Sequence, residues 1–336
     1  MAARIERSVG KDMPGEDTPG EDTPGMPLRG ISLPPAPDAG QTLADGPGLH
    51  TLAPRRKLSW AWLGLLPFLL FAFFFMILPA SSIVIGSFQN EAGSFTLDNL
   101  ANLFKPSILD SYLVTMKVSA TTALLGGILG LLIAYAISIG GLPKSLKTFM
   151  STFSGVASNF AGVPLAFAFI ATLGRMGFLT VLLRTLFGFE LYNTGFNLYS
   201  FWGLTLTYTY FQIPLMILII EPALEGMKKE WREATESLGA SSLQYWTRVG
   251  IPVLLPSILA ALILLFGNAF GAYATAYALT GGLINIVPIL IGAQIRGNVL
   301  HDPNLGYALA FGMVVVMTVS ILFYSWLQKI SSRWVK

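Results

Sequence analysis

The chain has 336 residues, of which 53% are hydrophobic and 12% are charged, and its formal net charge is +3. Soluble domains carry roughly 25% charged residues, so this composition excludes an ordinary soluble globular protein and predicts an integral membrane protein. The sequence contains no cysteine, which excludes a disulfide, a thiolate metal site and a cysteine nucleophile.

Residues 1–54 form a polar N-terminal segment rich in Pro, Gly, Asp and Thr. The string PGEDT occurs at residues 14–18 and again at residues 19–23. Such a composition cannot bury enough apolar surface to offset the entropy of ordering, so we expect a disordered cytoplasmic tail, either without a specific role or acting as a docking peptide. We expect no secretory signal, because the first apolar run begins near Trp60 and is too long for one.

Six apolar runs follow within residues 55–336, which we interpret as one transmembrane domain. A bilayer core about 30 Å thick needs about 20 residues of helix, and each run is long enough. The predicted fold is therefore an all-α membrane protein with six transmembrane helices. The expected spans are residues 60–87, 110–139, 151–173, 199–222, 253–281 and 306–330.

The distribution of Lys and Arg around these spans predicts their orientation, because cytoplasmic flanks carry an excess of positive charge. One side holds twelve such residues, namely Arg55, Arg56, Lys57, Lys144, Lys147, Lys228, Lys229, Arg232, Arg248, Lys329, Arg333 and Lys336. The opposite side holds four, namely Lys105, Arg175, Arg184 and Arg296. We therefore expect both termini to be cytoplasmic. The outer loops are then residues 88–109, 174–198 and 282–305, and the second is amphipathic enough to form a short interfacial helix.

A mostly polar segment at residues 225–252 separates the fourth and fifth runs and has the signals of two short helices joined by a bend. Lys228–Leu238 contains strong helix formers, and Gly239 stands where a helix C′ residue with positive φ is expected. Ser241, three residues before Gln244, has the spacing of a capping box for a second helix. We refer to residues 225–252 as the elbow.

The second elbow helix is expected to close at Pro252, and Pro256 is expected to open the fifth span. Helices under about 12–15 residues are marginal in water, so the elbow must pack on something. The residues alone leave two options open, namely the membrane helices of the same chain or a second protein.

The elbow resembles the EAA motif in the permease subunits of binding-protein-dependent ABC importers. Glu233-Ala234-Thr235, three residues, Gly239, nine residues and Val249–Pro252 follow the family pattern of Glu-Ala-Ala, three residues, Gly, nine residues and Ile-x-Leu-Pro. The departures, at Thr235, Val249 and Ile251, keep residues of similar size. Other stretches similar to the family are Phe95–Leu100, Pro214, Leu254–Ile258 and Gly271–Thr275.

The resemblance implies a type I ABC importer permease fold in the cytoplasmic (inner) membrane. Two permease subunits, identical or related, would form the pathway, an ABC ATPase dimer would bind their elbows, and an extracytoplasmic binding protein would deliver the solute. Glu233 would be the acidic contact to the ATPase and Gly239 the bend. The candidate apolar contacts are Trp231, Ala234, Leu238 and Tyr245. The chain has no phosphate-binding G-x-x-x-x-G-K-[ST] loop, so ATP hydrolysis is expected on a partner chain.

Polar side chains within the expected spans are candidates for the translocation pathway, because such groups are costly in lipid unless they are paired or face a cavity. These candidates are Asn159, Tyr208, Gln212, Asn268, Tyr273 and Thr275. Hydrogen bonding between helices is the alternative explanation. The small-xxx-small pairs Gly126…Gly130 and Gly267…Gly271 predict close helix packing instead.

No acid–base pair, nucleophile or metal-ligand cluster is evident, so we predict neither catalysis nor a cofactor nor a nucleic-acid partner. Within the importer permeases, the sequence is most similar to the polyamine (spermidine/putrescine) group, which predicts a small polar solute. A stand-alone secondary transporter or channel is the competing hypothesis. It would be expected to show inverted repeats, and it leaves the elbow unexplained.

Overall fold

A computed structural model describes residues 64–296 and 301–331, and side-chain surroundings are described as far as residue 330. The expected tail at residues 1–54, with its two PGEDT repeats, lies outside the described residues. The regular secondary structure of the described part is helical, apart from one isolated bridge between Gln89 and Phe95.

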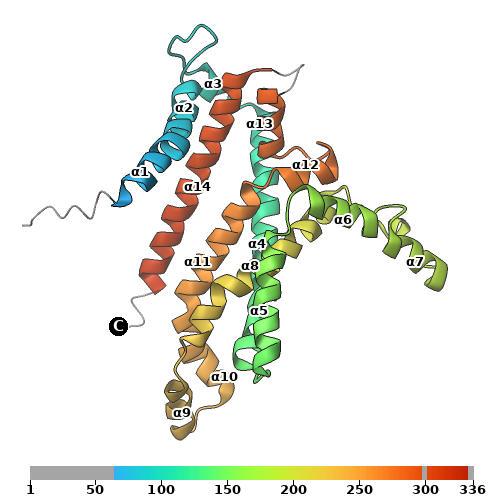
Figure 1. The fold of residues 1–336 in the computed structure, drawn as a ribbon, viewed down its shortest axis with the longest axis vertical. Coiled ribbons are helices and arrows are strands. Elements are labelled where there is room, and N and C mark those ends of the chain that lie inside the picture. The colour runs from blue at the N-terminus through green and yellow to red at the C-terminus, as the bar shows by residue number, and fades with distance from the viewer. Residues whose placement is uncertain (1–63, 297–300, 332–336) are drawn as a thin grey trace, which may run out of the picture. The chain divides into compact units, whose positions relative to one another are not determined.

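The helices follow one another with short connections (Figure 1). In chain order they are α1 (Leu66–Ala72), the π-helical turn η2 (Phe73–Ile77), α2 (Leu78–Ser87), α3 (Asp98–Asn102), α4 (Pro106–Ile139), α5 (Lys144–Asn159), α6 (Val163–Leu173), α7 (Phe178–Phe187), the 3₁₀ turn η3 (Leu191–Thr194), α8 (Phe201–Glu225), α9 (Lys229–Ser237), α10 (Ser242–Tyr245), the π-helical turn η4 (Trp246–Gly250), α11 (Ile251–Phe270), α12 (Ala274–Thr280), α13 (Val287–Arg296) and α14 (Pro303–Ser331).

Six helical stretches in the described chain are long and apolar enough to cross a bilayer, which confirms the predicted fold class and number of spans. They are Leu66–Ser87, Pro106–Ile139, Val163–Phe187, Phe201–Glu225, Ser242–Phe270 and Pro303–Ile330. All three expected outer loops also contain helices, with α3 in the first, α7 in the second and α13 in the third. The amphipathic α7 was predicted, whereas the apolar α13 was not, and α13 packs against α14.

Helix α8 is the centre of the described bundle. Two thirds (67%) of its most apolar window is buried, compared with 0% for the first span, so α8 is internal and the first span is peripheral. It packs along α4 at two glycines, where an added Cβ at Gly126 would lie 2.4 Å from the Cβ of Gln212 and one at Gly130 would lie 2.6 Å from the Cβ of Met216. Only glycine allows this approach, and the close packing predicted for this pair is confirmed.

The third and fifth expected spans are each interrupted, which corrects the prediction of two continuous helices at residues 151–173 and 253–281. Helix α5 ends at Asn159 and α6 begins at Val163, while α11 ends at Phe270 and α12 begins at Ala274. The intervening residues are mostly apolar or small, so the hydropathy of each run stays high across its break and does not mark the end of a helix.

The two breaks meet in the bundle, because α6 packs against α12. The backbone N–H of Gly162 donates to Thr275 Oγ1 at 2.8 Å, and the hydroxyl of Tyr208 donates to the backbone oxygen of Ala272 at 2.6 Å. Side chains thus satisfy backbone groups that the interrupted helices leave open. This is the condition under which irregular backbone is tolerated inside a membrane protein.

The expected helix end at Pro252 is wrong, because the chain remains helical from Ser242 to Phe270. The π-helical turn η4 lies directly before α11, and the N–H of Ile251 donates to the backbone oxygen of Trp246. A π turn widens the helix where the proline lacks an N–H. Pro252 is therefore accommodated in the first turn of α11 and does not end the helical stretch. Pro79 follows η2 in the same way.

Candidate coupling site and translocation pathway

Helix α9 ends in a tight left-handed bend at Gly239, as the sequence predicts. Gly239 has a φ of 76°, its N–H donates to the backbone oxygen of Glu236 at 2.9 Å, and the N–H of Ala240 donates to that of Thr235 at 3.0 Å. This pair of bonds is a Schellman motif, which satisfies carbonyls that the helix end leaves open. Because a left-handed φ is inexpensive only for glycine, Gly239 fixes the angle between the two elbow helices.

Helix α10 begins with the capping box that the sequence predicts. Ser241 Oγ accepts a hydrogen bond from the N–H of Gln244 at 3.3 Å, and the N–H of Ser241 donates to Gln244 Oε1 at 2.8 Å. Farther along, an added Cβ at Gly250 would lie 2.5 Å from the Trp246 indole, so glycine is needed there for that ring to lie flat on the backbone. Local sequence therefore determines both the start of this helix and its packing.

The elbow has an inner side that packs on the bundle. Tyr245 is only 6% exposed, and the Trp246 ring packs edge-on against Tyr135 of α4 with 5.1 Å between ring centroids. Tyr245, predicted as an apolar contact to a partner, thus lies on the side that holds the elbow to its own chain. Trp231 is half-buried.

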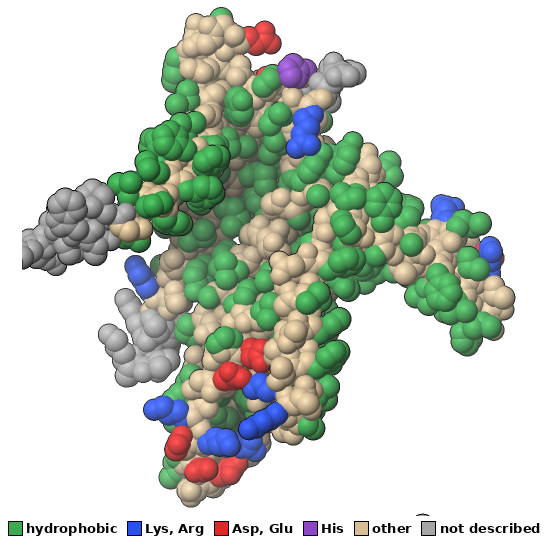
Figure 2. Space-filling model, in the orientation of Figure 1, with side chains coloured by type: hydrophobic (Ala, Val, Ile, Leu, Met, Phe, Trp, Pro, Cys, Tyr) green, Lys and Arg blue, Asp and Glu red, His purple; other side chains and the backbone are tan. Residues whose placement is uncertain are grey.

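The opposite side of the elbow is open. Leu238 is 85% exposed and Leu243 is 73% exposed, and Glu233, Ala234 and Gly239 are also exposed. Two large apolar side chains at a polar tip form the kind of surface that a protein partner covers. Figure 2 shows charged side chains gathered at this end of the bundle, where α9 and α10 lie in Figure 1.

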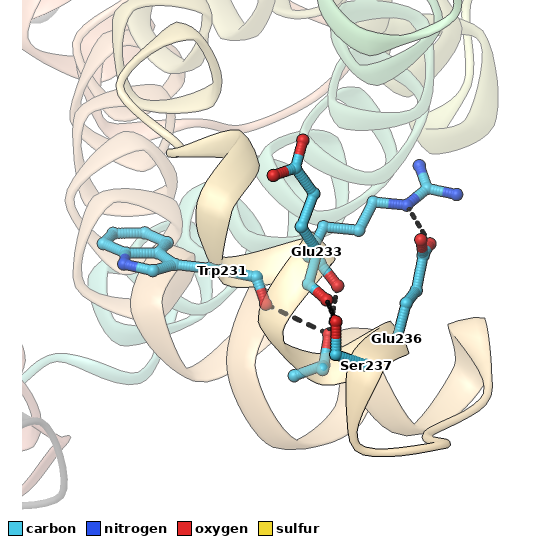
Figure 3. Close-up of polar contacts among 6 residues, drawn as sticks. Trp231, Glu233, Glu236 and Ser237 are labelled. Atoms are coloured by element: carbon cyan, nitrogen blue, oxygen red, sulfur yellow. Dashed lines mark hydrogen bonds and ion pairs between the residues drawn. The ribbon is translucent and has the colours of Figure 1, made fainter.

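Glu233 differs from Glu236 of the same helix by its surroundings. Glu236 pairs with Arg232 at 2.9 Å, and this hydrogen bond raises the pKa of Arg232, whereas Glu233 forms no ion pair within the described chain. Figure 3 shows Trp231 and Glu236 on opposite sides of α9, with Glu233 between them. Glu233 also lines a cavity of about 590 Å³ between the elbow and the adjoining ends of α4 and α8. Its carboxylate is therefore available to a partner.

Two polar links join α5 to the end of α8 that leads into the elbow. Lys147 forms an ion pair with Glu225, and the Ser151 hydroxyl contacts both carboxylate oxygens of Glu221 at 2.7 and 3.0 Å. The hydrogen bond to Glu225 raises the pKa of Lys147 above its usual value. The sequence contained these four residues but gave no signal of their pairing, because each pair is 70 or more positions apart.

Three of the six predicted pathway residues are buried at contacts between helices. Thr275 joins the two helix breaks through Gly162, and Tyr208 holds the second break to α8. Gln212 Nε2 donates to the backbone oxygen of Leu265 at 2.7 Å. Gln212 Oε1 is buried and has no hydrogen-bond partner in the described chain. These contacts are those expected of helix packing, and the pathway role stays a prediction.

The other three predicted pathway residues are accessible in the single chain. Asn159 and Asn268 are exposed, and Asn159 Nδ2 donates to the backbone oxygen of Gly155 at 2.9 Å. Tyr273 is half-buried and stacks on Tyr277 with 5.4 Å between ring centroids, within the range of about 4.5–7 Å that aromatic pairs prefer. Among the described residues, no group of three or more His, Cys, Asp or Glu could hold a metal ion.

The comparisons with known proteins assign the family. Residues 126–336, more than half of the chain, match the family described as "Binding-protein-dependent transport system inner membrane component". The chain belongs to this family, so it is a multi-pass membrane component of an ABC importer and not an enzyme. The resemblance inferred from the elbow is confirmed.

Curated relatives cover most of the chain at low identity. A probable sulfate transport permease of Nephroselmis olivacea is 26% identical over 280 residues, covering 81% of this chain and 90% of the relative. The spermidine/putrescine permease PotB of Haemophilus influenzae is 25% identical over 276 residues, covering 77% and 91%. The molybdenum permease ModB of Mycobacterium tuberculosis is 26% identical over 223 residues, covering 65% and 78%.

A solved structure supports the fold. A chain of a bacterial ABC transporter that imports the acidic polysaccharide alginate superposes with a TM-score of 0.64 at 16% identity, covering 80% of this chain and 94% of that one. The relatives named above have different solutes. They therefore agree on the class of protein and leave its solute undetermined.

Proposed function

We propose that this permease forms half of a solute pathway and receives the motion of a separate ABC ATPase through its elbow. A second permease subunit, identical or related, completes the pathway. Both termini and the elbow face the cytoplasm, and a substrate-binding protein acts at the opposite membrane face. The solute is small and polar. Sulfate, polyamine and molybdenum permeases are all among the relatives, so similarity does not favour a polyamine over the others.

The observation that carries the coupling proposal is the continuity of the elbow with two spans. The chain is helical without interruption from Ser242 in the elbow to Phe270 at the end of α11. At the N-terminal end of the elbow, α9 follows α8 after only three residues. A force on the exposed tip at Leu238 therefore acts on α8 and α11 directly. The links from α8 to Lys147 and Ser151 extend the same movement to α5.

A stand-alone transporter or channel is the competing function. It gives no role to an exposed tip that combines Leu238 and Leu243 with an unpaired Glu233 carboxylate. A partner with an apolar groove and a basic rim matches both features, because charged groups at the rim guide association while apolar contacts stabilise it. The geometry thus favours a docking role for the elbow.

The charge of Glu233 provides the test. The Glu233→Lys variant is expected to lose the ATPase on co-purification and to lose ATP-driven uptake, while its amount in the membrane stays unchanged. Glu91→Lys, the same charge reversal in the first predicted outer loop, is the matched control and should keep both activities. Co-purification of the ATPase with Glu233→Lys at wild-type yield, together with normal uptake, would show that this residue has no coupling role.

A further inference from the structure

A second cavity, of about 300 Å³, lies at the break between α11 and α12. Gly271 and Tyr273 of the break line one side, and Gly292 and Arg296 of α13 line the other. The remaining lining residues are Pro288, Ile291, Ile295 and Met313, none of which carries a charge. Among the described residues, Arg296 is thus the only charged residue on the cavity wall.

Two contacts fix the position of Arg296, and both involve the Tyr273 ring. An added Cβ at Gly292 would lie 3.0–3.2 Å from the Tyr273 ring and hydroxyl, so the phenol lies flat against the glycine backbone. The guanidinium carbon of Arg296 lies over the same ring, 5.7 Å from its centroid. This cation–π contact holds the guanidinium beside the cavity without neutralising its charge.

The hydrogen-bond donors at this cavity have no competing acceptor. Arg296 forms no ion pair within the described residues, and the Tyr273 hydroxyl donates no hydrogen bond to them. The acidic residue nearest in sequence beyond α13 is Asp302, whose Oδ1 accepts the N–H of Leu305 at the start of α14. The cavity therefore presents a guanidinium and a phenol hydroxyl, and the described residues place no carboxylate on its wall.

We propose that this cavity is a selectivity point of the pathway and that the solute is a small oxyanion. The inference rests on the proposed permease function and names its solute class. Arg296 is exposed to the cavity. Its guanidinium fork matches the oxygens of a tetrahedral oxyanion, and charge-assisted hydrogen bonds are stronger than neutral ones. The adjoining break at Gly271–Tyr273 places these donors where backbone rather than regular helix borders the cavity.

The same wall disfavours a polyamine. A cationic solute would meet the like charge of Arg296 and would find no carboxylate on the wall to replace its lost hydration. Proteins stabilise desolvated ammonium groups by pairing them with acidic side chains.

The test measures uptake of labelled sulfate, molybdate and spermidine by cells that contain the full transporter. The wild-type chain is expected to import at least one of the two oxyanions. Arg296→Gln should lower that import by about tenfold, the loss expected for one charge-assisted hydrogen bond, and Arg296→Lys should lower it less. Arg184→Gln removes a charge from α7, which does not line the cavity, and should leave uptake unchanged.

Two results would overturn the proposal. One is import of spermidine alone, or of neither oxyanion, by the wild-type chain. The other is oxyanion import that Arg296→Gln leaves at the wild-type rate. Co-purification of the ATPase with Arg296→Gln separates a selectivity defect from failed folding, because a folded variant keeps its partner. Failure of the coupling proposal looks different, since Glu233→Lys would then keep the ATPase and normal uptake whichever solute is supplied.

Discussion

Replacement of Gly239 by valine tests whether the left-handed bend transmits motion. The residue has a φ of 76°, and nothing lies within 4 Å of an added Cβ. Valine at this position would therefore clash with no neighbour, and its whole effect would be backbone strain. This property makes Gly239 a cleaner probe than a buried glycine.

The expected size of the effect follows from that strain. Holding a bulky residue in the left-handed region costs about 2 kcal/mol. Since every 1.4 kcal/mol is a factor of ten, the bent elbow would become about 30-fold less populated relative to other conformations. Asparagine tolerates the left-handed region better than valine does, so Gly239→Asn should have a smaller effect.

The assay compares ATPase co-purification and ATP-driven uptake for Gly239→Val, Gly239→Asn and a matched control. Gly93 has a φ of 77° and open space around an added Cβ, but it lies in the first predicted outer loop. Gly93→Val thus introduces the same strain away from the elbow. We expect both readouts to fall in the order wild type, asparagine, valine, and to stay at wild-type levels in Gly93→Val.

Two outcomes would refute the reasoning. If Gly239→Val kept wild-type co-purification and uptake, the bend would not be part of the coupling. If Gly93→Val lost both readouts to the same extent, the defect would come from general destabilisation and not from the elbow. Membrane yield of each variant, measured in parallel, identifies chains that fail to insert.

Two further substitutions test the bundle itself. Gly126→Val would place side-chain atoms against Gln212 at the α4–α8 contact and should destabilise the fold by about 1–3 kcal/mol. The melting temperature of the detergent-solubilised protein should fall, and an unchanged temperature would contradict the close packing. Thr275→Val removes the acceptor for the Gly162 N–H and should lower the free energy of unfolding by about 1–3 kcal/mol. Thr275→Ser keeps the hydroxyl and should retain wild-type stability, so equal stability of the two variants would argue against that hydrogen bond.

The elbow shows how far local sequence alone can lead. The bend at Gly239 and the capping box at Ser241 and Gln244 were both predicted, and the structure confirms them. Each depends on atoms within about five residues, so the residues that specify it are adjacent in the chain. The end of the helix at Pro252 was predicted wrongly, because the π turn directly before α11 accommodates a residue without an N–H. The helix-breaking tendency of a single proline does not predict such a turn.

The helix breaks inside two apolar runs could not be predicted from the sequence. Phe160–Gly162 and Gly271–Tyr273 do not lower the hydropathy of their runs enough to mark an end. They are stabilised by distant partners: Thr275 accepts the N–H of Gly162 in the first break, 113 positions away, and Tyr208 of α8 donates to Ala272 in the second. No local pattern contains that information.

By itself, the sequence determined that this is an all-α membrane protein with six spans and an importer-type elbow, because hydropathy, glycine conformation and helix capping are local properties. Only the tertiary structure decided which polar groups are buried, which face outward and which meet. It turned Tyr245 toward the bundle, placed Gln212 against α11, and brought Arg296 over Tyr273. Burial and pairing depend on neighbours far away in the chain, which become neighbours only when the helices pack.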